Sequence, residues 1–229
     1  MTTRINIDIV SDAVCPWCFI GKRRIEAALA QAPGDTRYFI GWRPFQLNPD
    51  MPPEGMDRKA YLAAKFGGDT RADRMYQSVR EAGATVGIDF NFEAMKRTPN
   101  TINAHRVIGV SGRAGLQDPV VEGLFRAYFL EGRDIGDAGV LIEIGAAAGL
   151  DPKMLRAYLA GNEDVDRVRN EDMTARRMGI QGVPCFVFNR KYAVSGAQEP
   201  EVLLQVIERV KNEPVESAAA EQAQSTASS

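Results

Sequence analysis

The spacing of apolar residues predicts a strand, a helix and a second strand at the start of the chain. Residues 4–10 alternate apolar and polar side chains, with three isoleucines on one side, as in a strand with one buried face. From Cys18 to about residue 32 the apolar side chains recur near helical spacing, and residues 37–43 again have the pattern of a strand. Pro16 suits the first position of the helix, where the missing N–H group would have no partner anyway.

The middle of the chain, residues 56–162, has the pattern of several helices with little strand. Apolar residues recur through it at helical spacing, and the stripe between Val121 and Phe129 is expected to form core rather than to contact a cofactor. Five residues of the type that starts helices precede such runs: Asp57, Thr70, Thr101, Asp137 and Asp151.

The C-terminal part returns to a mixed pattern. We expect a charged helix over 163–178, a hairpin of strands 184–188 and 191–195, and a last helix over 200–211. The sequence therefore predicts an α/β domain that a helical insertion divides in two. Its parts are residues 1–55, the insertion 56–162, residues 163–212, and a tail over 213–229 whose composition is typical of disorder.

Composition and charge narrow the class of protein. The chain has 229 residues, of which 45% are hydrophobic and 25% charged, as in a globular protein with a sizeable core. Its 28 Lys and Arg against 30 Asp and Glu leave no positive surplus for nucleic acid or an anionic membrane. No run approaches the length of a membrane span, and the first residues lack the pattern of a signal peptide. We therefore expect a cytoplasmic protein, in which structural disulfides are rare.

Two cysteines in Cys15-Pro16-Trp17-Cys18 stand where the first helix begins. At a helix start, unpaired N–H groups and the positive end of the helix dipole stabilise a thiolate, and the thiolate is the form that attacks disulfides. Cys15 is thus predicted to be the acidic nucleophile, and Cys18, one turn later, the more buried thiol that closes the ring. Asp12 would raise the pKa of Cys15 if its carboxylate pointed the same way.

The alternative interpretation of the cysteine pair is half of a zinc site. Zinc sites with four thiolates normally combine two such pairs, and here there is one pair and a lone Cys185. A proline and a tryptophan between the cysteines also favour a helix start over a metal-binding turn. Redox chemistry is the preferred hypothesis.

A second clue is Val183-Pro184, directly ahead of a predicted strand. A cis bond at this proline would let the Val183 backbone lie beside the disulfide and pair with a substrate as an added strand. Cys185 would then lie close to the other two cysteines. We expect it to be a small buried residue, with a redox role or a third metal ligand as alternatives. His105, the one histidine, is expected to be a structural helix residue or to line a pocket.

The chain resembles the DsbA-like thioredoxin superfamily, and within it the FrnE-like branch that is often labelled 2-hydroxychromene-2-carboxylate isomerase-like. The resemblance covers about residues 5–210, in the order of the family. The segments that carry it are SDAVCPWCFIGKRRIE, PFQLNPDMP, PNTINAHR, LFRAYFLEGRDIGD and GIQGVPCFVFNRKYAVSGAQ.

The resemblance implies a thioredoxin-like fold interrupted by an all-helical domain, which agrees with the division above. It also implies a dithiol–disulfide oxidoreductase with Cys15 as nucleophile, Cys18 as resolving thiol and Pro184 as the cis-proline. Strongly oxidising relatives carry histidine at the position of Trp17, so Cys15 should be less acidic here than in them. Many relatives have threonine at the position of Cys185, which leaves open an extra disulfide or a metal held by three thiolates.

The related kappa-class glutathione transferases and the chromene isomerase share this architecture but use serine at the position of Cys15. In them the residue before the cis-proline, here Val183, binds glutathione together with a helix start that corresponds to Gly196-Ala197-Gln198. The acidic residue that these relatives have at the helix start is not reproduced by Ala197 and Gln198.

These observations lead to three hypotheses. The first is a thiol–disulfide oxidoreductase or isomerase without a bound cofactor, acting on protein or small-molecule disulfides, as a monomer or a homodimer. The second is a glutathione-dependent transferase or isomerase, and glutathione also stays open as a co-substrate of the first. The third is a non-enzymatic module that binds a metal through the three cysteines. The insertion is expected to fold over Cys15, with four residues either lining an apolar groove or belonging to the core: Trp17, Phe45, Leu47 and Met51.

Overall fold

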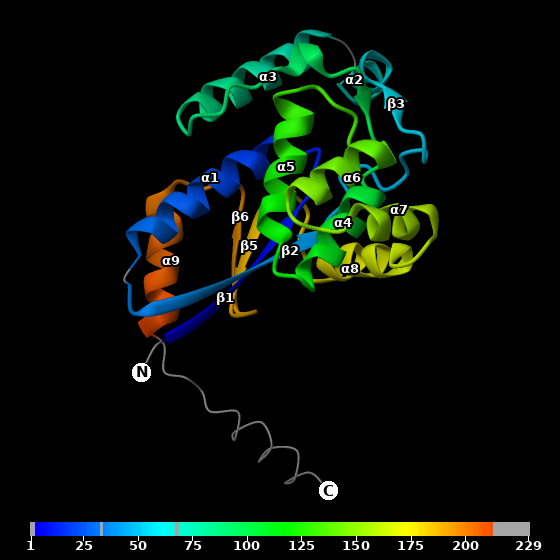
Figure 1. Cartoon of the computed structure of the whole chain (residues 1–229). Coiled ribbons are helices and arrows are strands. Elements are labelled where there is room, and N and C mark those ends of the chain that lie inside the picture. The colour runs from blue at the N-terminus through cyan, green and yellow to red at the C-terminus, as the bar shows by residue number, and fades with distance from the viewer. Residues whose placement is uncertain (1–2, 33, 67–68, 213–229) are drawn as a thin grey trace, which may run out of the picture.

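A four-stranded sheet formed from the two ends of the chain is the centre of the fold. The computed structural model describes residues 3–32, 34–66 and 69–212. The strands are β1 (Thr3–Ser11), β2 (Thr36–Pro44), β5 (Cys185–Phe188) and β6 (Tyr192–Ser195), in the spatial order β2-β1-β5-β6. Strand β2 runs parallel to β1, whereas β5 is antiparallel to both β1 and β6 (Figure 1).

One face of this sheet carries the main core. The isoleucines predicted to share a face of β1 are all buried, and they belong to one apolar cluster with side chains of α1 (Pro16–Gln31) and α9 (Pro200–Asn212). The opposite face carries a smaller cluster of Val10, Phe45, Ala175, Cys185 and Val187 under α8 (Val165–Arg177). The sheet thus separates two apolar layers, as the alternation of side chains along its strands requires.

Helices make up most of the chain between β2 and β5. They are α2 (Arg58–Phe66), α3 (Asp69–Ala84), α4 (Ile102–Gly112), α5 (Gln117–Phe129), α6 (Ala138–Ala147), α7 (Pro152–Ala160) and α8, with a 3-10 turn at Phe92–Ala94. The short strands β3 (Met56–Asp57) and β4 (Arg97–Thr98) form a second, antiparallel sheet. The fold is the thioredoxin-like fold with a helical insertion that the sequence predicts. No helix in the described part of the chain is long and apolar enough to cross a membrane.

Three of the predicted helix starts are confirmed by side-chain hydrogen bonds. The carboxylates of Asp57, Asp137 and Asp151 accept backbone N–H groups near the starts of α2, α6 and α7, at 3.0, 3.0 and 2.9 Å. Thr101 is the N-cap residue of α4, as predicted, but its side chain makes no cap bond, and Asn100 Oδ1 accepts the Ile102 N–H instead, at 3.0 Å. Thr70 lies within α3, after its first residue.

The predicted hairpin is confirmed as β5 and β6, joined at Asn189 and Arg190. Both joining residues have positive φ angles, 47° and 58°, which is the backbone form that two-residue hairpin turns need. The tail predicted over 213–229 lies outside the described residues.

The helical part is fixed to α1, the helix that begins at the cysteine pair. Phe19 of α1 stacks on Phe125 of α5, with ring centroids 5.1 Å apart. Lys22, only 3% exposed, contacts carboxylates of α1 and α5, among them Asp118 at 3.1 Å and Glu122 at 3.4 Å. Apolar and ionic contacts therefore hold the insertion against the start of α1.

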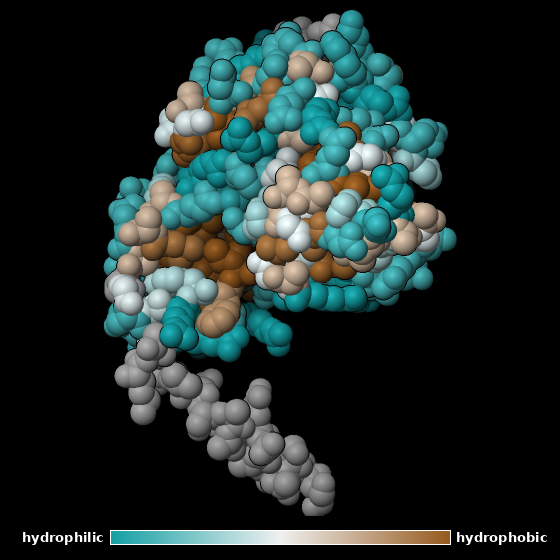
Figure 2. Space-filling model, in the orientation of Figure 1, coloured by the Kyte–Doolittle hydropathy of each residue, from teal (hydrophilic) through white to brown (hydrophobic). Residues whose placement is uncertain are grey.

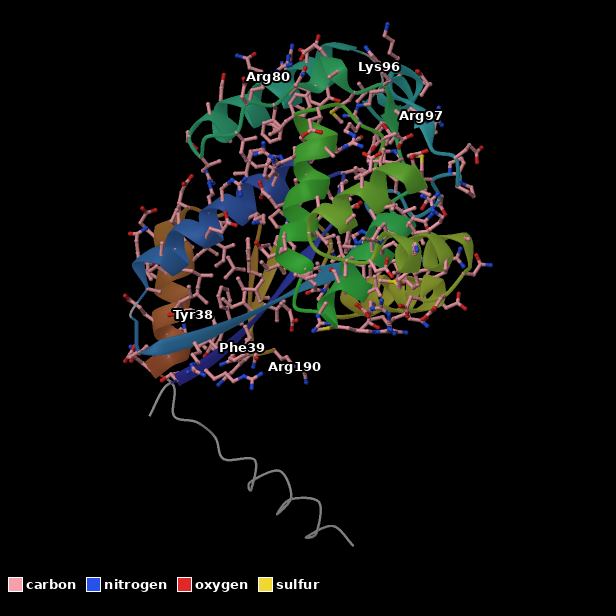
Figure 3. All side chains as sticks on the ribbon, in the orientation of Figure 1. Tyr38, Phe39, Arg80, Lys96, Arg97 and Arg190 are labelled. Atoms are coloured by element: carbon pink, nitrogen blue, oxygen red, sulfur yellow. The ribbon has the colours of Figure 1, made fainter. Side chains whose placement is uncertain are left out.

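The face of the molecule in Figure 2 is mostly hydrophilic, with an apolar hollow between α1 and β2. The edge strand β2 exposes the apolar side chains of Phe39 and Ile40. Charged groups are spread over both ends of the molecule. Arg97 lies at the helical end and Arg190 at the sheet end (Figure 3), and Arg97 forms an ion pair with Asp134 at 3.4 Å.

Candidate active site

The chain turns from β1 into α1 so that Cys15 becomes the residue at the helix start. Cys15 has extended backbone angles (φ −93°, ψ 111°), and Pro16 occupies the first turn of the helix. The Cys15 N–H donates to the Asp12 carbonyl, and the Cys15 carbonyl accepts the N–H of Cys18, both at 3.0 Å. The sulfur of Cys15 is thus held at the end of α1 where backbone N–H groups are unpaired.

The Val183–Pro184 bond is cis, and it brings the distant C-terminal segment to Cys15. The Cys15 thiol donates to the Val183 carbonyl, with Sγ and O 3.5 Å apart. Gly21 of α1 makes this approach possible, because a Cβ atom there would lie 2.9 Å from Cγ of Pro184. The two motifs that the sequence singles out therefore meet, although 168 residues separate them.

The two cysteines of the pair are both buried free thiols, and they differ in their surroundings. Cys15 is 4% exposed and Cys18 is 1% exposed. Burial raises the pKa of the Cys18 thiol well above its ordinary value, and the neighbouring Cys15 raises it further. Hydrogen bonds from the Ser11 hydroxyl and the Asp12 backbone act in the opposite direction without reversing the shift. Cys18 thus retains its proton in the resting protein, which suits the resolving role.

The Asp12 side chain points away from the cysteine pair and into the protein. Its Oδ2 accepts the Leu47 N–H at 2.7 Å, and its Oδ1 lies 3.3 Å from Nε2 of His105. Asp12 is fully buried and His105 is 4% exposed. Sequence reasoning placed His105 in a helix or a pocket but missed this pair, and a histidine and an aspartate 93 residues apart give no pattern that would reveal it.

The predicted glutathione segment also lies beside the cis-proline. Gly196 has a φ of 82°, and its N–H donates to the Pro184 carbonyl at 2.8 Å. The buried Arg24 of α1, which sequence reasoning did not select, donates to the Ala197 carbonyl and pairs with Glu199 at 2.6 Å. The Gln198 side chain folds back onto the Ser195 carbonyl at 2.8 Å and is exposed.

Trp17 is half-buried beside the pair and Val183 is half-buried against it. Of the four residues proposed for a groove, Phe45 and Met51 are buried, as core residues are, and Leu47 is half-buried like Trp17.

Cys185 is separated from the other two cysteines by the sheet. It pairs with Val10 of β1 and belongs to the small cluster under α8, whereas Cys15 and Cys18 belong to the main core on the other face. Burial raises the pKa of Cys185, and a hydrogen bond with Ser195 opposes the shift. Within the described residues no three His, Cys, Asp or Glu side chains are grouped so that they could hold a metal ion. The expectation that Cys185 lies beside the pair is therefore wrong, because its side chain emerges on the opposite face of the sheet.

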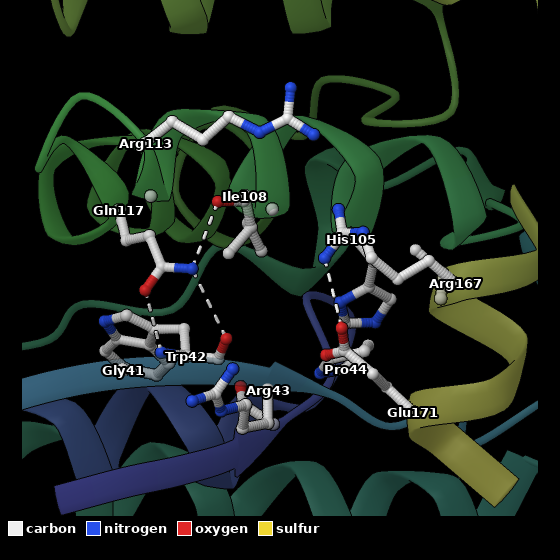
Figure 4. Close-up of a pocket in the computed structure, with 14 residues that line it drawn as sticks. Gly41, Trp42, Arg43, Pro44, His105, Ile108, Arg113, Gln117, Arg167 and Glu171 are labelled. Atoms are coloured by element: carbon white, nitrogen blue, oxygen red, sulfur yellow. Dashed lines mark hydrogen bonds and ion pairs between the residues drawn. The ribbon is translucent and has the colours of Figure 1, made fainter. Parts of the chain in front are cut away.

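A cavity of about 420 Å³ lies between α4, β2 and α8. Ser11 and His105 both line it, as do Gln117 and charged groups. Figure 4 shows Arg167 and Glu171 of α8 at the same end as His105, and Gln117 and Trp42 at the other end.

A cysteine pair at a helix start, opposite a cis-proline on a thioredoxin-like sheet, defines a class of redox proteins. Residues 6–208 match the model of the DSBA-like thioredoxin domain, so the chain belongs to that family. The family is one of thiol-based oxidoreductases, and this chain is a redox protein of that general kind.

Known structures agree with this assignment. A crystal structure of a probable DsbA oxidoreductase from Streptomyces coelicolor is 30% identical, with 93% of each chain covered and a TM-score of 0.83. The structure of 2-hydroxychromene-2-carboxylate isomerase is 16% identical, with 90% of this chain and 95% of that chain covered and a TM-score of 0.68. The cytosolic disulfide reductase DsbM from Pseudomonas aeruginosa, with GSH, is 18% identical, with 89% and 98% covered and a TM-score of 0.63. The isomerase and DsbM thus share the fold of this chain.

Proposed function

We propose that the protein is a thiol–disulfide oxidoreductase that exchanges or isomerises disulfides through Cys15 and Cys18. The observation that carries this proposal is the position of Cys15 Sγ, at the start of α1 and 3.5 Å from the carbonyl before the cis-proline. A sulfur held there is next to both the N–H groups that stabilise a thiolate and a backbone segment that can bind a peptide.

The reaction follows from the different environments of the two thiols. The Cys15 thiolate attacks one sulfur of a substrate disulfide, forms a mixed disulfide and releases the other sulfur as a thiolate that takes a proton from solvent. Cys18, buried one turn further along α1, then loses its proton and attacks the Cys15 sulfur. The Cys15–Cys18 disulfide forms, and the second substrate thiol leaves. The reverse sequence oxidises a dithiol substrate.

Substrate binding is assigned to the segment around the cis-proline. The Val183 backbone can pair with an extended peptide, and the half-buried Trp17 is the aromatic contact beside the pair. We describe the protein as FrnE-like, because the segments that carry the resemblance run through both halves of the site. We place it in the cytoplasm, where a cysteine pair of this kind serves catalysis rather than structure. Substrates are disulfide-bonded proteins or small molecules.

The test is reduction of insulin, and refolding of a protein with scrambled disulfides, by purified protein with a thiol reductant. Wild type should be active and Cys15→Ser inactive, whereas Cys185→Ser, a matched change of a buried cysteine on the other face of the sheet, should retain activity. Equal activity of wild type and Cys15→Ser would refute the proposal.

Glutathione is the second candidate ligand at the same site, as the reductant or as part of a mixed disulfide. The observation that favours it is the Gly196–Gln198 segment packed on Pro184, and the structure of DsbM that contains GSH is similar in fold. Calorimetric titration of the Cys15→Ser variant with reduced glutathione measures this directly. Binding that weakens in Arg24→Gln, because Arg24 holds the Ala197 carbonyl, would support the assignment. If the titration releases no heat of binding, glutathione is excluded as a ligand of this site.

A further inference from the structure

A second pocket lies on the face of the sheet that carries the smaller apolar cluster. It has a volume of about 770 Å³ and is lined by residues of β1, β2, β5 and α8 and of the turns after α8 and β5. Its buried lining includes Val10, Ala175 and Val187, all members of that cluster. Neither Cys15 nor Cys18 lines it, and both belong to the main core on the other face. The disulfide exchange proposed above therefore makes no use of this pocket.

The apolar wall of the pocket is formed just after α8. Ile180 is half-buried there, and Met178 is 63% exposed. A methionine side chain is unbranched and adapts to ligands of different shape. The apolar lining contains no aromatic ring, so it offers surface to an aliphatic chain rather than a ring to stack on. The volume lies within the range of sites that bind small molecules.

Charged side chains surround this apolar surface. They are three arginines, Arg43, Arg167 and Arg190, and two carboxylates, Asp8 and Glu171. Arg43 pairs with Asp8 at 2.7 Å, and Arg167 pairs with Glu171 at 3.1 Å. The two carboxylates are thus neutralised by two of the arginines, and Arg190 supplies one positive charge in excess.

The guanidinium of Arg190 has no hydrogen bond or ion pair with any residue that the structure describes. It is exposed at the sheet end of the molecule (Figure 3). Arg190 also has a φ of 58°, at the second position of the turn between β5 and β6, where glycine is the usual residue. A side chain with a Cβ atom is disfavoured in that backbone form. The chain therefore carries a free cation at a position where glycine would fit the backbone better.

We propose that this pocket binds a small amphipathic carboxylate, with its aliphatic chain on the apolar lining and its carboxylate on Arg190. The guanidinium offers paired N–H groups that match the two oxygens of a carboxylate. A ligand with two negative charges fits less well, because the second charge would lie near Asp8 and Glu171. The inference does not rest on the proposed function.

The test uses octanoate as the probe, with octanol and octylammonium as ligands of the same chain length and different charge. Binding is followed by NMR of the protein with isotope-labelled methionine methyl groups. The Met178 methyl group reports on the pocket. Met173 is the internal control, because it is a 47% exposed methionine of α8 that does not line the pocket.

We expect octanoate to shift the Met178 signal saturably and to leave the Met173 signal unchanged. Octanoate should bind about fivefold more tightly than octanol, which is the upper end of what an exposed ion pair contributes. Octylammonium should bind more weakly than octanol. Hexanoate should bind about tenfold more weakly than octanoate, since two fewer CH₂ groups are then buried.

The variant that tests the charge is Arg190→Asn, because asparagine also tolerates a positive φ and so preserves the turn. It should lower the affinity for octanoate to that for octanol and leave octanol binding unchanged. Arg169→Gln is the matched control. It removes one exposed arginine of α8 that does not line the pocket, and it should bind all three ligands as wild type does.

Four results would overturn the inference: no saturable shift of Met178, equal shifts of Met178 and Met173, equal affinities for octanoate and octylammonium, or unchanged octanoate binding in Arg190→Asn. Each of them leaves the proposed function standing, because disulfide exchange is measured separately with Cys15→Ser. Conversely, equal exchange activity of wild type and Cys15→Ser would refute the proposed function without affecting the carboxylate site.

Discussion

The buried pair of Asp12 and His105 should contribute several times more to the stability of the fold than an exposed pair of the same kind. Replacing Asp12 by alanine removes the acceptor of the Leu47 N–H and the partner of His105 Nε2. A buried donor that loses its acceptor destabilises a protein by about 1–3 kcal/mol, so two of them give about 2–6 kcal/mol. Because His105 also lines a cavity where water can replace the lost partner, we expect the lower half of that range, about 3 kcal/mol.

The matched comparison is Asp8→Ala. Asp8 pairs with Arg43 at 2.7 Å, but the two side chains are 23% and 50% exposed, and such pairs are worth about 0–1 kcal/mol. Both variants are unfolded in urea in the reduced state, with fluorescence as the signal. With a slope of about 2–3 kcal/mol per molar urea, Asp12→Ala should lower the midpoint by roughly 1 M and Asp8→Ala by less than half of that.

A double-mutant cycle with His105→Ala completes the test. The two residues share one contact, so the double variant should lose less stability than the sum of the single variants. If Asp12→Ala shifts the midpoint no more than Asp8→Ala, or if the cycle shows additivity, the pair is not a stabilising unit and the reasoning fails.

Three further predictions concern α1 and its surroundings. Burial raises the pKa of Cys18 above its ordinary value of 9.0, so the unfolded chain releases this proton at a lower pH than the folded protein does. The stability of the reduced protein should therefore fall as pH rises above about 9, more steeply in wild type than in Cys18→Ala, and parallel pH curves of urea midpoints would contradict this. Lys22→Met should lower the free energy of unfolding by about 1–3 kcal/mol, because it removes the partner of Asp118 and leaves Glu26 and Glu122 with Arg23 alone. A midpoint equal to that of wild type would show that the Lys22 contacts contribute nothing. Gly21→Ala should slow disulfide exchange, since its Cβ would lie 2.9 Å from the Pro184 ring and move the cis-proline segment from Cys15. Gly34→Ala is the control, because no heavy atom lies within 4 Å of the new Cβ. Equal exchange rates in the two variants would contradict the prediction.

The sequence alone was enough to predict the helices and strands of this protein and the cysteine pair at the centre of its candidate site. Alternation along β1 and helical spacing after Cys18 are local patterns, and a strand or helix needs only local periodicity to be recognised. The helix starts at Asp137 and Asp151 are local for the same reason, since the cap and the N–H it accepts are two or three residues apart. Thr101 shows the limit of such local patterns. The neighbouring Asn100 is also close in sequence to the first N–H group of the helix, and its side chain accepts the hydrogen bond instead.

Only the tertiary structure decided which of these elements face one another. Three features depend on how distant segments pack: the pairing of Asp12 with His105, the hydrogen bond from Arg24 to the Ala197 carbonyl, and the position of Cys185 on the other face of the sheet. Cys185 is the clearest case, since one step along a strand turns a side chain to the opposite face. Neighbours in sequence can thus be separated by the whole sheet, while residues 93 positions apart share a hydrogen bond in the core.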